Sequence, residues 1–219
     1  MIRIFWIDQF NLLHVACQND YTSVKTIEYL LEIKSDINRN DNFYQNTPLH
    51  LALMNSVNPE LIEYLLDQKS DPNLLDSIGN NALLIACENE KFSLKIIKLL
   101  IEKKCNINAI NRRDYSPVTI ASRNQSGTLD LVKLLIENGA DVNLRDSYVS
   151  PLHFAVLNNQ IGFEVINFLV LSKCDLNWKN IYDVSLLDVA LQNQSLIMDI
   201  RRIFGKEPSV RQVLKGINK

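Results

Sequence analysis

One six-residue pattern recurs along this chain and limits the folds that the chain can adopt. Its fullest copy is Thr-Pro-Leu-His-Leu-Ala at residues 47–52, where threonine can cap a helix and proline can fill the first helical position. The six copies all begin with Ser, Thr or Asn and end with Ala: 11–16, 47–52, 81–86, 116–121, 150–155 and 185–190. Successive final alanines are 36, 34, 35, 34 and 35 residues apart, and a near-constant period of this length predicts a solenoid of stacked repeats.

A second pattern, four residues long, keeps the same period and ends in asparagine. Its copies are 35–38, 70–73, 105–108, 140–143 and 174–177. Each copy follows a segment whose apolar residues fall on one side of a helix: 24–34, 61–69, 94–104, 129–138 and 163–173. Residues that can cap these helices precede the first four segments: Ser23, Asn58, Ser93 and Thr128. Each repeat is therefore expected to be a short helix, a turn, a second helix and an extended loop.

An asparagine also stands three residues after each aligned alanine: Asn19, Asn55, Asn89, Asn124, Asn158 and Asn193. Asparagine tolerates the left-handed backbone conformation and bonds to nearby backbone groups. We therefore expect these residues to end the first helix of each repeat.

These patterns resemble the ankyrin repeat family, whose hallmarks are a Thr-Pro-Leu-His-x-Ala helix start and a Gly-Ala-Asp-Val-Asn ending. Residues 47–52 and 139–143 match the two hallmarks, and the resemblance extends roughly from Asp8 to Phe204. It implies an all-α fold, an ankyrin-repeat solenoid of helix-turn-helix units joined by β-hairpin-like loops. Two departures are a period longer than the family's ~33 residues and a hairpin-tip glycine that survives only as Gly79. The equivalent tip positions hold Gln45, Asp114 and Asp183.

The chain is expected to have three parts. Residues 11–204 form six ankyrin-like repeats, and residues 205–219 form a C-terminal capping helix. Residues 1–10 form an N-terminal cap, since terminal repeats of an array need their apolar faces covered. A boundary inside a larger protein is the competing explanation for the atypical ends.

The residue types that usually carry chemistry fall at repeated structural positions. His14, His50 and His153 all take the fourth position of the six-residue pattern, where the resemblance implies bonds to backbone and to the capping residue. The four cysteines are expected to be small buried apolar groups: Cys17, Cys87, Cys105 and Cys174. No Cys-x-x-Cys pair, glycine-rich phosphate loop or His-Glu-x-x-His element occurs. We therefore expect no catalytic residues, no metal site, no cofactor and no enzymatic activity.

The overall charge and hydropathy give no sign of nucleic acid or membrane. The formal net charge is -2, and no apolar run approaches the ~20 residues that span a bilayer. The apolar N-terminal segment is too short for a signal peptide. We expect a cytoplasmic or nucleocytoplasmic monomer without a nucleic-acid partner and without membrane insertion.

Function is expected where the repeats differ from one another. In ankyrin-like arrays the variable residues lie at the hairpin tips and on the outer positions of the first helices, which line a concave groove. Arg, Tyr and Trp are the types most enriched at binding hot spots, and they gather at these positions in the second half of the chain. The predicted protein-binding residues are Arg112, Arg113, Tyr115, Arg123, Arg145, Tyr148, Trp178 and Tyr182.

The sequence thus predicts a non-catalytic protein-protein interaction scaffold or adaptor, whose partner is a protein segment of acidic and apolar character. One alternative is a targeting module of a larger protein or complex that carries the catalytic activity. A catalytic segment beyond Lys219 would favour that alternative. Nucleic-acid binding by the Arg and Tyr side chains is a third possibility, and it would show a steep dependence on salt.

Overall fold

The computed structural model describes residues 12–55, 58–89, 93–123, 128–144, 149–157, 163–186 and 188–189. The chain divides into two compact units, Met1–Pro117 and Val118–Lys219. The predicted N-terminal cap, most of the sixth repeat and the predicted C-terminal capping helix lie outside the described residues.

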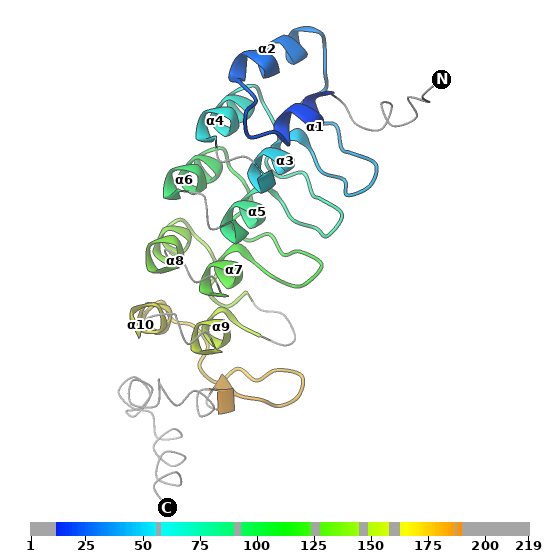
Figure 1. The fold of residues 1–219 in the computed structure, drawn as a ribbon. Helices are drawn as coiled ribbons and strands as arrows, with labels where there is room; N and C mark the ends of the chain where they lie inside the picture. The colour runs from blue at the N-terminus through cyan, green and yellow to red at the C-terminus, as the bar shows by residue number, and fades with distance from the viewer. Residues whose placement is uncertain are drawn as a thin grey trace, which may run out of the picture. The chain divides into compact units, whose positions relative to one another are not determined.

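Unit 1 contains three pairs of helices in two layers (Figure 1). The first helices of the pairs are α1 (Leu12–Cys17), α3 (Pro48–Asn55) and α5 (Ala82–Glu88). The second helices are α2 (Val24–Glu32), α4 (Pro59–Asp67) and α6 (Leu94–Glu102). Within each layer every helix contacts the next, and the two helices of each pair also contact one another. The loops that join successive pairs extend from the layer of first helices, on the side away from the second helices (Figure 1).

Unit 2 continues the same alternation. Its helices are α7 (Pro117–Arg123), which begins at the last residue of unit 1, α8 (Thr128–Glu137), α9 (Pro151–Leu157) and α10 (Phe163–Leu171). Helix α10 contacts both α9 and α8. A sixth copy of the helix start follows, because Val189 N donates to Ser185 O at 3.2 Å.

Helices are the only regular elements among the described residues, apart from one isolated antiparallel bridge between Lys179 and Ser185. The four described loops that follow second helices are hairpins, each closed by a backbone hydrogen bond such as that from Asp41 N to Asn46 O. The prediction of an all-α solenoid with β-hairpin-like loops is therefore confirmed.

The first helices begin at the residues that the six-residue pattern predicts. Thr47 Oγ1 accepts a hydrogen bond from His50 N at 3.3 Å, and Asn81 Oδ1 accepts one from Leu84 N at 3.0 Å. In unit 2, Ser150 Oγ accepts from His153 N at 3.3 Å. Each bond satisfies a backbone N–H that the first turn of a helix leaves without an intrahelical acceptor.

The second helices end one or two residues earlier than the apolar segments predict, because the chain turns into the left-handed region. Lys34, at the end of α2, has a φ of 65°. Its N–H donates to Leu31 O at 2.9 Å, and Ser35 N donates to Leu30 O at 3.1 Å, which is the bonding of a Schellman motif. The same pair of bonds ends all five described second helices, with these residues in the left-handed position: Lys34, Lys69, Lys104, Gly139 and Lys173.

Asn55 and Asn89 stand at the ends of first helices, as predicted, but without the left-handed backbone. Asn124, Asn158 and Asn193 lie outside the described residues. Asn55 is the last residue of α3, and Asn89 follows α5 with a φ of -87°, which is not left-handed. Asn89 Nδ2 donates to Leu53 O at 2.9 Å and so ties one first helix to its neighbour. The recurrence of asparagine here reflects side-chain bonds rather than a strained backbone.

The asparagine that ends the four-residue pattern links a repeat to the next one at three positions. Asn73 Oδ1 accepts from Asn106 N at 2.6 Å, and Asn73 Nδ2 donates to Lys104 O at 3.1 Å. Asn38 makes the equivalent bonds one repeat earlier in unit 1. Asn143 makes them in unit 2. A single side chain thus satisfies two backbone groups of the following repeat.

The apolar core of unit 1 fills the space between its two layers. Its fully buried large side chains are Leu13, Ile27, Leu49, Leu53, Leu61, Ile62, Leu65, Leu83, Leu84, Ile96 and Leu100. Burying one such side chain contributes ~1.5–3 kcal/mol, so the packing between layers is the main source of stability.

Candidate protein-binding surface on the hairpin loops

Each described hairpin loop is organised by one side chain that accepts hydrogen bonds from the backbone at the tip. In the second loop, Asp76 Oδ1 accepts from Ile78 N at 2.9 Å and from Asn80 N at 2.8 Å. Such bonds hold a tight turn without any regular strand. The organising residues of the four described loops are Asp41, Asp76, Asn111 and Asn180.

The first hairpin is one residue longer than the others. Asp41 N donates to Asn46 O, five positions further along the chain, at 2.8 Å. Asp76 N donates to Asn80 O, only four positions further along, at 2.9 Å. This additional residue accounts for the longest repeat spacing, the 36 residues between Ala16 and Ala52.

The residues predicted to replace the hairpin-tip glycine adopt the glycine conformation. Gln45, Asp114 and Asp183 have φ values of 53°, 62° and 60°, and Gly79 has a φ of 81°. Gly79 also needs its small size, because an added Cβ would lie 3.1 Å from Arg112 N. The tip positions inferred from the repeat alignment are therefore correct.

Neighbouring hairpins of unit 1 are bonded to one another. Ser77 N in the second loop donates to Tyr44 O in the first at 2.7 Å, and Arg112 N in the third donates to Ile78 O in the second at 2.8 Å. These bonds bring the three loops side by side, as Figure 1 also shows for their traces. The three tips of unit 1 form one continuous surface, which we call the tip surface.

The tip surface of unit 1 exposes large apolar side chains. Tyr44 is 66% exposed and Leu75 is 51% exposed. The exposed apolar residues of the three loops are Phe43, Tyr44, Leu75, Ile78 and Ile110. Exposed apolar side chains that cluster in this way mark interaction surfaces in many soluble proteins.

Three of the predicted binding residues belong to the tip surface. Arg112 and Arg113 are exposed, and Tyr115 is half-buried. Arg39, at the base of the first loop, is a further exposed cation. The first helix α3 contributes the exposed Met54, at the outer position that the sequence predicts to face a partner.

The other five predicted residues belong to unit 2. Arg145 and Tyr148 lie outside the described residues. Arg123 is half-buried at the end of α7 in unit 2. Trp178 is half-buried in unit 2, and its ring meets the His153 ring edge-on at 4.8 Å between centroids, so it contributes to internal packing. Tyr182 is exposed at the tip of the same hairpin.

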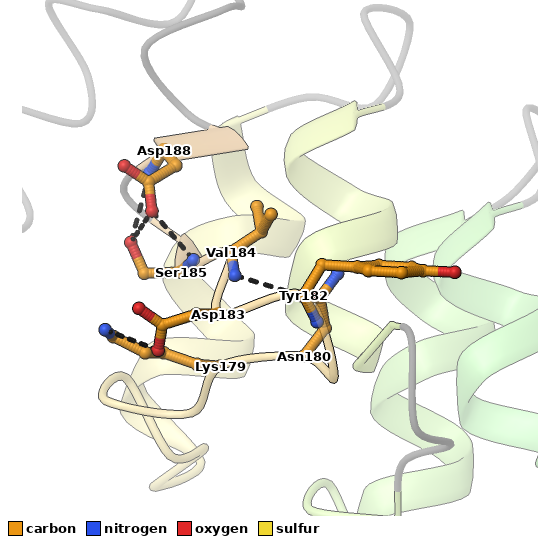
Figure 2. A network of polar contacts seen from close by, with 7 residues as sticks. All are labelled: Lys179, Asn180, Tyr182, Asp183, Val184, Ser185 and Asp188. Atoms are coloured by element: carbon orange, nitrogen blue, oxygen red, sulfur yellow. Dashed lines mark hydrogen bonds and ion pairs between the residues drawn. The ribbon is translucent and has the colours of Figure 1, made fainter.

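Figure 2 shows how polar contacts fix this hairpin of unit 2. Asn180 Oδ1 accepts from Tyr182 N and Val184 N, at 2.9 and 3.0 Å, and the Tyr182 ring points away from the loop. Lys179 Nζ forms an ion pair with Asp183 at 2.8 Å, and this carboxylate raises the pKa of Lys179. The loop therefore holds an exposed aromatic ring on a bonded framework.

The histidines have the structural role that the family resemblance implies. His50 Nδ1 accepts from Thr47 N at 3.1 Å, and His14 Nε2 lies 3.0 Å from Asn46 O. Burial lowers the pKa of His14, His50 and His153, for His153 to about 4. The three imidazoles are therefore neutral near pH 7.

In the sixth repeat an aspartate takes the place of the histidine. Ser185 N and Ser185 Oγ donate to Asp188 Oδ2 at 2.8 and 2.6 Å (Figure 2). These bonds lower the pKa of Asp188. The Asp188 carboxylate thus accepts the same kind of backbone bond as the imidazole nitrogen of His50, from the N–H of the residue three positions before it.

The cysteines behave as buried apolar groups, as predicted. Cys17, Cys87 and Cys105 are buried, Cys174 is half-buried, and all four are free thiols. Burial raises their pKa values, to about 12 for Cys17, Cys105 and Cys174, which makes them poor nucleophiles. Within the described ranges, no three His, Cys, Asp or Glu side chains are grouped so that they could hold a metal ion. No helix in the described part of the chain is long and apolar enough to cross a membrane.

The sequence prediction gave too little weight to the apolar tips of unit 1. It emphasised the residue types that dominate hot spots and so favoured Arg, Tyr and Trp of the second half. Phe43 and Ile78 stand at tip positions in the sequence, but only the structure shows that the neighbouring hairpins leave them exposed.

Comparison with known families agrees with the geometry of the repeats. A family model described as ankyrin repeats (3 copies) matches residues 5–76 and 55–146, and one described as ankyrin repeats (many copies) matches residues 125–170. No curated protein matches the chain. The family matches extend over more than half of the 219 residues, and the paired helices, capped starts and hairpin loops repeat in the same phase. The chain belongs to the ankyrin repeat family.

Proposed function

We propose that this protein is a non-catalytic adaptor of the cytoplasm or nucleocytoplasm that binds a partner protein. Ankyrin repeats are generally protein-binding modules, and they are typically non-catalytic. The binding site we propose is the tip surface of unit 1 together with the adjoining first helices, which in this family line a concave groove. The predicted residues Arg112, Arg113 and Tyr115 belong to it.

The exposure of Tyr44, Leu75 and Ile78 is the observation that carries this proposal. Apolar side chains that remain in water at loop tips do not contribute to the stability of the fold. Covering them by a partner would contribute ~25 cal/mol for each Å² of apolar surface removed from water. The loops that present them are bonded to one another, so little conformational entropy would be lost on binding.

The charges of the tip surface favour a partner segment with acidic residues beside apolar ones. Arg39, Arg112 and Arg113 are exposed cations. The nearby carboxylates of Asp41 and Asp76 are buried and accept bonds from the backbone, so they are not available to a partner. The carboxylate of Asp114 is exposed and offsets one of the three cations. Guanidinium groups pair with carboxylates through two parallel hydrogen bonds, which adds specificity to the apolar contact.

The test begins with affinity purification of the full chain and mass spectrometry to identify a partner. The dissociation constant of that partner is then measured for two double variants, Tyr44→Ala/Ile78→Ala and Arg112→Glu/Arg113→Glu. We expect each to weaken binding by about 2 kcal/mol or more, which is about thirty-fold in Kd.

The control is Lys98→Glu, which reverses a single positive charge on the exposed side of α6. It should leave the dissociation constant unchanged. If both double variants bind as the unmodified protein does, the partner contacts another surface and the proposed site is wrong.

A further inference from the structure

The first repeat has an open apolar face at positions that are buried in the repeats that follow it. Val15 on α1 is 53% exposed, whereas Leu51 of α3 and Ile85 of α5, which take the same position of the six-residue pattern, are 3% and 5% exposed. Leu12 on α1 is 57% exposed, and its equivalent Ala82 is fully buried. Helices α3 and α5 each contact the first helix that precedes them, whereas no helix precedes α1 among the described residues.

Helix α2 also exposes a side chain whose equivalent in the next repeat is more buried. Tyr29 is exposed, whereas its equivalent Tyr64 of α4 is half-buried. Helix α4 contacts the preceding second helix α2. Burial raises the pKa of Tyr64, and the nearby carboxylates of Glu28 and Glu32 on α2 raise it further. Tyr29 has no preceding helix among the described residues, so the open face extends from α1 to α2.

We propose that residues 2–7 of this same chain cover the open face. Five of these six residues are apolar: Ile2, Ile4, Phe5, Trp6 and Ile7. Residues 8–11 join them to α1, and an extended link of this length can reach ~13 Å, which exceeds the ~10 Å diameter of a helix. The segment therefore has the composition and the reach to contact Leu12 and Val15.

In this arrangement residues 2–7 take the place of the preceding helix pair, which covers the corresponding face in each later repeat of unit 1. A terminal repeat with an uncovered apolar face favours association of arrays end to end. Residues 2–7 prevent this by intramolecular contact, at the high effective concentration that a short link provides. The inference does not depend on the proposed partner surface, because the tip surface lies on different residues.

Trp6 provides a direct test. The chain has two tryptophans, so the variant Trp178→Phe leaves Trp6 as the sole tryptophan reporter. In this background the emission of Trp6 should be blue-shifted relative to the urea-unfolded protein, and its quenching constant with acrylamide should be several-fold lower. Adding Val15→Glu should shift the emission to the red and restore the quenching.

The matched control is Leu75→Glu, which alters a similarly exposed apolar residue elsewhere in unit 1. It should leave Trp6 emission unchanged, and far-UV circular dichroism verifies that each variant is folded. Trp6 emission typical of solvent in the Trp178→Phe protein, or emission insensitive to Val15→Glu, would overturn the proposal. Shielding that appears only as protein concentration rises would assign the contact to a second copy and would also overturn it.

Discussion

The lysines that end the second helices of unit 1 allow a stability prediction of definite sign. Lys34, Lys69 and Lys104 have φ values of 65°, 68° and 61°, and each occupies the left-handed position of a Schellman motif. A residue with a Cβ pays ~1–2 kcal/mol for this conformation. Glycine avoids that cost, but it makes the unfolded chain more flexible, which lowers the stability by ~0.4–1 kcal/mol.

Each Lys→Gly substitution at these positions should therefore stabilise the protein by about 0.5–1 kcal/mol. The carbonyls of Lys69 and Lys104, which accept bonds from Asn38 and Asn73, are unaffected because they belong to the backbone. The three sites lie in different repeats, so the triple variant should gain about 1.5–3 kcal/mol. For a chain of this size the gain corresponds to a rise in melting temperature of about 3–12 °C.

The assay is urea unfolding followed by far-UV circular dichroism, with the thermal midpoint as a second measure. The Lys→Ala triple variant is the matched control, since it removes the same charges and keeps a Cβ in the left-handed region. A second control, Lys98→Gly in the interior of α6, should lose ~1 kcal/mol. Equal midpoints for the glycine and alanine triple variants would refute the strain argument.

Two further predictions concern acid sensitivity and the junctions between repeats. The folded protein holds the pKa of His153 at about 4, so the unfolded chain binds a proton first as pH falls below 6.5. Stability should drop by about 2 kcal/mol between about pH 7 and pH 5, and His153→Asn should show a smaller drop in urea midpoint. Asn73→Ala removes the bonds to Asn106 N and Lys104 O and should lower the free energy of unfolding by about 1–3 kcal/mol, whereas Asn40→Ala should not. Equal urea midpoints for the two alanine variants would contradict that role of Asn73.

The repeat pattern predicts most of the backbone because each landmark has a local physical cause. Asn81 and Ser150 cap helices in the structure as their sequence positions suggest. Gln45 and Asp114 adopt the glycine conformation because their neighbours require a tip at that position. Because the same caps and turns recur at the same position of every repeat, few other folds are compatible with the sequence.

Other features depend on contacts between repeats and cannot be read from one repeat alone. Lysine has no preference for the left-handed region, and the carbonyls of Lys69 and Lys104 in that region accept bonds from Asn38 and Asn73 of the preceding repeat. The half-buried position of Trp178 depends on the His153 ring beside it. The exposure of Phe43 and Ile78 depends on how closely the hairpins of unit 1 approach one another.

The bonds made by Asn38 and Asn73 have a consequence for how such a chain can change length. Each side chain forms its hydrogen bonds to main-chain groups of the following repeat, namely Asp71 N and Lys69 O for Asn38. Main-chain groups are the same in every repeat, whatever side chains it carries. Duplication or loss of a whole repeat in the gene would thus leave every junction with its donor and acceptor, so the array can lengthen or shorten in steps of one repeat while its tips acquire new side chains.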